Sequence, residues 1–97
     1  MTKLLSVTKS DSPGKKWKAV FELDNGRTKT THFGAAGMED YTQHHDKVRR
    51  EMYRARHKRD LKTGDPTRAG FLSMEVLWGD STSFAQNLAA YKRRHNL

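Results

Sequence analysis

The chain has 97 residues, the size of one domain, and it contains no cysteine, so disulfides and thiolate zinc sites are excluded. Its 19 basic and 11 acidic residues give a net charge of +8. That charge favours an acidic partner such as nucleic acid, an anionic membrane or an acidic protein face, although a basic surface can also serve solubility alone. No segment is long and apolar enough to span a bilayer, and the opening MTKLLSVTK is too short for a secretory signal, so we expect neither membrane insertion nor secretion.

Residues 3–33 are expected to form a three-stranded antiparallel meander. Alternation is weak in the first strand, Lys3–Lys9, and clear in the second, Lys16–Leu23, where every second residue is apolar. The alternating apolar residues are Trp17, Ala19, Phe21 and Leu23. The segment Asp24–Gly26 predicts a hairpin turn, because Asn-Gly tolerates positive φ, and it leads to a return strand over Arg27–Phe33.

The register of this hairpin depends on the length of its loop. A two-residue Asn-Gly loop would set Glu22 opposite Lys29, which is a favourable cross-strand pair. The same register would put Phe33 on the face opposite Trp17 and Phe21. A longer loop would reverse that placement, so the sequence leaves the register open.

Three helices are expected after a connection over Gly34–His45. The first, 46–61, begins at Asp46, whose carboxylate suits an N-cap, although Thr42 could start the helix a turn earlier. Its apolar residues form only a narrow stripe, and the rest of the helix is polar. The stripe consists of Val48, Met52 and Ala55.

The second helix, 66–78, is expected to be the centre of the core. Asp65 is the predicted N-cap, Pro66 suits the first helical position, and Gly79 is the predicted stop. Apolar residues lie on two opposite sides, Ala69, Leu72 and Val76 on one and Phe71, Met74 and Trp78 on the other. A helix that is apolar on two sides is normally buried between layers, so we expect the sheet on one side and helices on the other.

The last helix, 81–95, is expected to start at a cap formed by Asp80 or Ser81. Phe84, Leu88 and Tyr91 form its buried stripe by i, i+4, i+7 spacing. The predicted fold class is therefore α+β, a small three-stranded antiparallel β-meander followed by three helices, in a single domain covering residues 1–97.

Basic residues concentrate in the first predicted helix. Lys47–Lys62 holds eight basic and two acidic residues, so it carries +6 of the net charge of +8. Arg50, Arg54 and Lys58 are spaced i, i+4, i+8 and are expected to form an outer ridge that contacts phosphates. On another flank, arginines around a tyrosine could clamp phosphates and stack a base. The candidate binding residues are Arg49, Arg50, Tyr53, Arg54, Arg56, His57 and Lys58.

A structural interpretation of the same helix remains open. In it the helix is a solvated face, and Tyr53 and Arg56 pack against the sheet or bond to loop carbonyls. For Tyr53 alone, the structural interpretation is the preferred one.

Four histidines lie near acidic residues and raise the question of a metal site. They are His32, His44, His45 and His57. Imidazole and carboxylate groups can build a metal centre or a nuclease site, but the spacing matches no zinc pattern and gives no i, i+4 histidine pair on a helix. We therefore predict no metal ligands and assign the histidines to hydrogen bonding in loops and caps.

Several stretches are distinctive in combination: KKWKAVFE, THFGAAGMEDYTQHHD, the Arg49/Tyr53/Arg56-His57 pattern, GDPTRAGFLSMEVLW and the ending YKRRH. Together they span Lys15 to His95 and resemble a family of small uncharacterised proteins encoded by large DNA viruses of algae and other eukaryotes. The resemblance implies a viral origin and a location in the virion or in the cytoplasm or nucleus of an infected cell. It implies no established activity, so it supplies no catalytic residues.

The combined expectation is a small basic viral protein without enzymatic activity. It would bind an acidic partner, with nucleic acid such as DNA in first place, through the helix at 46–61. The alternative is a minor structural (cement) protein of a virus capsid that uses the same charges against an acidic capsid protein surface. A metal-dependent nuclease is a third and weaker possibility. No cofactor and no small-molecule substrate are expected.

Overall fold

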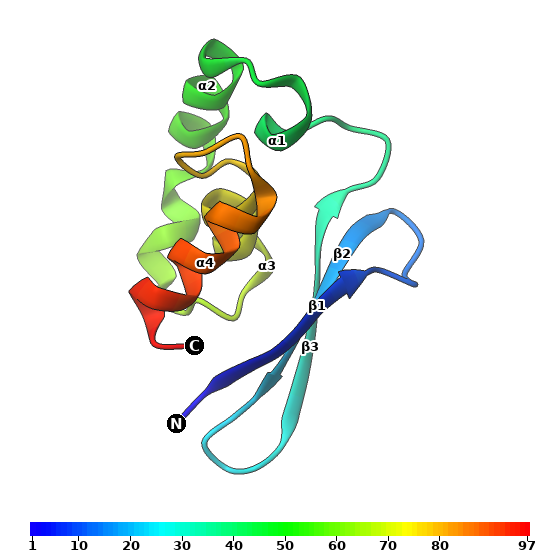
Figure 1. The fold of residues 1–97 in the computed structure, drawn as a ribbon, viewed down its shortest axis with the longest axis vertical. Coiled ribbons are helices and arrows are strands. Elements are labelled where there is room, and N and C mark those ends of the chain that lie inside the picture. Colours follow the sequence, from blue (N-terminus) through cyan, green and yellow to red (C-terminus); the bar gives the residue numbers. More distant parts are fainter.

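The computed structural model describes residues 1–97 and shows an antiparallel sheet with the helices packed on one side of it (Figure 1). The strands, in the sheet order β1-β2-β3, are β1 Lys3–Lys9, β2 Lys15–Glu22 and β3 Thr28–Ala35. The helical segments are α1 Tyr41–His44, α2 Lys47–His57, the 3-10 helix η1 Lys58–Thr63, α3 Ala69–Leu72, the π-helical segment η2 Ser73–Leu77 and α4 Phe84–His95. The predicted α+β class and meander are confirmed, with one additional short helix, α1, inside the expected connection.

The β2–β3 hairpin has the longer of the two loops that the sequence allowed. Its loop is Asp24–Gly26, and the strands pair Phe21 with Lys29 and Trp17 with Phe33. Lys29 thus lies opposite an aromatic residue, and the cross-strand ion pair expected from a two-residue turn does not form. Phe33 lies on the same face as Trp17, so both rings point toward the helices.

The chain between the sheet and α2 is fixed by side-chain caps. Asp40 caps α1 through a bond from the amide of Thr42, and Gln43 completes the capping box. Lys16 Nζ donates to Asp40 Oδ2 at 2.8 Å, and only 4% of the Asp40 side chain is exposed. Asp46 then caps α2, as predicted, by accepting from two backbone amides.

The centre of the core is the segment formed by α3 and η2, as the sequence predicted. Every residue from Phe71 to Gly79 is buried, and Leu72 and Val76 are completely inaccessible to solvent. The segment packs between the sheet, which contributes Ala19, Phe21 and Phe33, and α4, which contributes Tyr91. Burial on two sides follows from its two apolar sides.

The start of this segment differs from the prediction. Asp65 does not cap a helix that begins at Pro66; its carboxylate accepts from the amide and the hydroxyl of Thr67, and the helix begins only after Arg68. The carbonyl of Thr67 accepts from the hydroxyl of Thr31 on β3 at 2.7 Å. The expected first turn of the helix does not form, because this bond holds the chain against the sheet.

The last helix, α4, also begins slightly later than predicted. Its N-cap is Ser83, rather than Asp80 or Ser81, and the Ser83 hydroxyl accepts from the amide of Gln86. Its apolar stripe packs inward as expected, and Phe84 stacks on Trp17 with ring centroids 4.5 Å apart. None of the helices combines the length and the apolar composition needed to cross a membrane.

Candidate functional site

Helix α2 is oriented with a polar face toward the protein. Its half-buried side chains are those spaced i, i+3, i+4, i+7, namely Arg50, Tyr53, Arg54 and His57. The narrow apolar stripe instead faces solvent, with Val48 69% and Met52 55% exposed. The hydrophobic pattern of this helix therefore does not decide which face it packs with.

Two arginines of the expected outer ridge are structural. Arg54 Nη1 donates to the carbonyls of Met74 and Trp78 at 2.9 and 2.7 Å. Arg50 Nε donates to the carbonyl of Gly79 at 2.7 Å, and its Nη2 pairs with Asp80 at 2.8 Å. Carbonyls at the end of a helical segment have no partner within the segment, and the guanidinium groups supply one.

The outer placement predicted for these residues is therefore wrong for Arg50 and Arg54, and only Lys58 of that ridge is exposed. Burial, followed by the neighbouring charge of Arg50, lowers the pKa of Arg54 from its usual value. An arginine guanidinium is not deprotonated in proteins, so Arg54 remains a strong donor to the carbonyls.

Tyr53 also packs inside, in a stack of three rings. The centroid of its ring lies 4.1 Å from the ring centroid of Trp78, with 5° between the two ring planes. It lies 4.2 Å from the ring centroid of His57, with 26° between the planes. Two nearly parallel rings at this separation must occupy opposite faces of Tyr53. Burial, followed by the charge of Asp60, raises the pKa of the Tyr53 hydroxyl, so the residue is neutral at physiological pH.

The remaining cations of α2 and η1 are exposed. None of them forms an ion pair or a side-chain hydrogen bond within the protein, in contrast to Arg50. They are Lys47, Arg49, Arg56, Lys58, Arg59 and Lys62. We call this set the exposed cations. Three of the predicted binding residues belong to the exposed cations, namely Arg49, Arg56 and Lys58.

A cleft of about 550 Å³ opens beside α2, between this helix, the end of the β2–β3 hairpin and the α3–η2 segment. Arg49, Met52, Tyr53, Arg56 and His57 line its α2 side, and Trp78 lies next to them. The opposite side comes from the start of β2, the end of β3 and the loop before α1. Four of the predicted binding residues thus meet in one concave site.

Small residues form the inner surface of the cleft. Gly34, at φ +81°, lies so close to Leu77 that a Cβ would be 2.9 Å from Leu77 Cδ1. At Gly70 a Cβ would lie 2.7 Å from Cγ of Asp60. Larger side chains at these two positions would collide with the walls, so the depth of the cleft depends on them.

The charges of the cleft are distributed unevenly. Arg49 and Arg56 lie along the α2 lip, and Lys15 lies on the hairpin side. The carboxylates in the lining include Glu39 and Asp60, the latter 3.5 Å from His57 Nδ1. The cleft therefore offers cations at its lips, aromatic rings along one wall and carboxylates among its lining groups.

The predicted histidines lie in separate environments. His32 Nδ1 is 2.7 Å from the hydroxyl of Ser10, and His44 Nδ1 accepts from the amide of Asp46. His45 ends α1 in the left-handed conformation, and His57 lines the cleft. No group of three or more metal-ligating side chains occurs in the structure.

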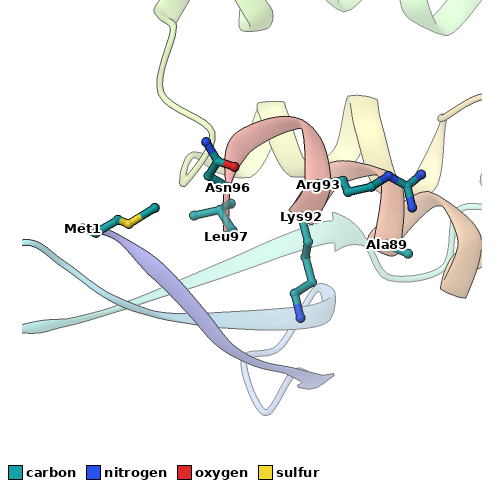
Figure 2. A pocket seen from close by; sticks show the side chains of 6 residues that line it. All are labelled: Met1, Ala89, Lys92, Arg93, Asn96 and Leu97. Carbon is teal, nitrogen blue, oxygen red and sulfur yellow. The ribbon is translucent and has the colours of Figure 1, made fainter.

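A second hollow lies where the two chain ends meet. Six residues line it, Met1, Ala89, Lys92, Arg93, Asn96 and Leu97, and Figure 2 shows the Lys92 side chain pointing toward the strands. It contains no aromatic ring and none of the predicted binding residues. The cleft beside α2 is therefore the better candidate site.

Comparison with protein families gives one match, a family of unknown function, DUF5754, over residues 5–57. This segment is more than half of the 97-residue chain. The chain belongs to the DUF5754 family. Comparisons with curated proteins and with solved structures gave no match. The matched part of this DUF5754 protein contains β1 from Leu5 onward, β2, β3, α1 and all of α2, and it ends before the α3–η2 segment that completes the cleft.

Several cleft residues of this DUF5754 protein were not predicted from the sequence. Lys15, Met38 and Asp60 lie far apart along the chain and carry no motif. Only Gly70 offered a local indication, because a glycine inside a predicted helix often marks a close approach of another group. Asp60 is the group that approaches it.

Proposed function

We propose that this DUF5754 protein is a non-enzymatic binding protein that recognises an acidic partner, with nucleic acid in first place, through the exposed cations of α2 and η1. The observation that carries the proposal is their lack of any partner within the protein. The acidic side chains in the same stretch contact their neighbours: Glu51 pairs with Arg50, and Asp60 lies beside His57. The exposed cations therefore have no intramolecular carboxylate to neutralise them.

The spacing of these cations suits a polyanion. Arg49 and Arg56 are two helical turns apart on the cleft side of α2, which separates their Cα atoms by about 10 Å at a rise of 1.5 Å per residue. Arg59, which does not line the cleft, adds a further exposed cation in η1. Several phosphates can thus be contacted together without any rearrangement of the helix.

Salt dependence of binding tests the proposal. Replacing Arg49, Arg56 and Arg59 together by Gln keeps helix propensity and removes only charge. Each lost phosphate contact should reduce the slope of log affinity against log salt by about 0.7 on a single strand, so we expect a reduction of about two. The measurement is fluorescence anisotropy of a labelled DNA strand over a range of salt concentrations.

A matched variant controls for net charge. Lys3 and Lys9 are exposed residues of β1, and Arg27 is an exposed residue directly before β3. Figure 1 shows β1 and the turn between β2 and β3 away from α2. Replacing all three by Gln removes the same charge and should leave the salt slope almost unchanged. Equal slopes for the two triple variants, or no binding by the parent protein at low salt, would refute nucleic acid as the partner of this surface.

A second candidate is an acidic protein surface, for instance that of a capsid. The observation that favours it is the apolar stripe of α2 that remains exposed beside the cations, together with Met38, which is 67% exposed. Exposed apolar groups rimmed by charge are typical of protein interfaces. We propose this minor structural role as the alternative, and copurification of the protein with an opened virus shell rather than with its genome would support it.

A further inference from the structure

We propose that the cleft beside α2 holds one unpaired nucleotide of a single strand, with the base stacked on His57 and the flanking phosphates at Arg49 and Arg56. This inference rests on the proposed nucleic-acid binding and adds to it the form of the ligand. Its first support is size. A volume of about 550 Å³ lies within the range of about 300–1,000 Å³ that is common for small-molecule pockets.

The ring stack ends at His57, on which no further ring is stacked. Trp78 is 8% exposed, and both faces of Tyr53 are covered, so neither ring can receive a ligand. His57 covers Tyr53 with one face only, its side chain is 42% exposed, and it is one of the residues that line the cleft. A planar group placed on this free face would extend the stack by one ring, which is how aromatic side chains bind bases of any sequence.

The charges fix the direction in which a nucleotide would lie. Asp60 and Glu39 are carboxylates in the lining, and they would repel a phosphate placed next to them. Arg49 and Arg56 at the α2 lip would attract it, as would Lys15 on the hairpin side. The uncharged base therefore belongs on the side of His57 and Asp60, and the phosphates belong at the lip.

This arrangement selects a single strand over a duplex. In a duplex the bases are stacked and paired, and placing one in a cleft requires it to be unstacked first. A single strand has little such pairing to lose. The exposed cations along α2 and η1 would then contact the phosphates on either side of the bound nucleotide.

The test compares strands that differ only in their bases. The probes are a short oligodeoxyadenylate, an abasic strand of the same length and charge, and the duplex form of the same sequence. We expect the wild-type protein to bind the oligodeoxyadenylate about tenfold more tightly than the abasic strand, which corresponds to about 1.4 kcal/mol and lies within the range for stacking of one base. The ring-proton signals of His57 should shift with the base-bearing strand and not with the abasic strand.

Two variants assign the effect to the ring at position 57. His57→Ala should remove the preference for bases and leave the salt slope unchanged, whereas His57→Phe keeps a stacking surface and should retain the preference. The comparison of strands on the wild-type protein needs neither variant. Equal affinity for the base-bearing and abasic strands, or tighter binding of the duplex, would overturn the cleft inference while leaving the proposed function standing. Failure to bind any probe at low salt would overturn both.

Discussion

The carbonyl-capping role of Arg54 makes the sharpest prediction about stability. Replacing Arg54 by Met removes the donor to the carbonyls of Met74 and Trp78 and keeps a long side chain of good helix propensity. A buried acceptor that loses its partner costs about 1–3 kcal/mol. Both carbonyls lose their donor, so we expect a total loss of about 2–4 kcal/mol. For a domain of this size, such a loss lowers the melting temperature by roughly 10–25 °C.

The control is Arg56→Met on the same helix. Arg56 is exposed and makes no hydrogen bond within the protein, so its replacement removes the same charge without leaving an acceptor unpaired. We expect a change within about 0.5 kcal/mol. Urea denaturation followed by far-UV circular dichroism would give both free energies of unfolding. If the two variants lose the same stability, the guanidinium of Arg54 does not hold the end of η2, and the explanation for the orientation of α2 fails.

Two further substitutions test the core and the cleft. Leu72 is completely buried between the sheet and α4, so Leu72→Ala should cost about 2–5 kcal/mol in the free energy of unfolding; a loss below about 1 kcal/mol would place the segment nearer the surface. Gly34→Ala combines a left-handed residue with a Cβ only 2.9 Å from Leu77 Cδ1, so it should cost about 1 kcal/mol or more. A Gly34→Ala variant as stable as the parent in thermal unfolding would contradict that packing.

The candidate site contains residues from the segment that matches the family and residues that lie beyond that segment. The DUF5754 match covers α2 and its cations, whereas Trp78, which anchors the ring stack, lies beyond the matched residues. Both proposals draw on residues beyond the match, since η1 begins at Lys58. The charge-based proposal depends on α2 and η1, and the cleft inference depends also on the α3–η2 segment.

The sequence by itself determined the elements and the centre of the core. Period-two apolar residues indicated β2, and the carboxylate of Asp46 indicated the start of α2. The two apolar sides of the segment around Leu72 indicated its burial. These features are readable because each depends on residues within a few positions of one another, where hydrophobic periodicity and capping act.

Only the tertiary structure decided how those elements meet. The start of the central helix moved because Thr67 bonds to Thr31, which is distant in sequence. The face that α2 buries was set by the carbonyls at the end of η2 and by the ring of Trp78, which together outweighed a narrow apolar stripe. Such groups have no partner until the chain has folded, so no pattern within α2 encodes them. The cleft exists for the same reason: its walls come from separate segments, and their contact is a property of the packed chain alone.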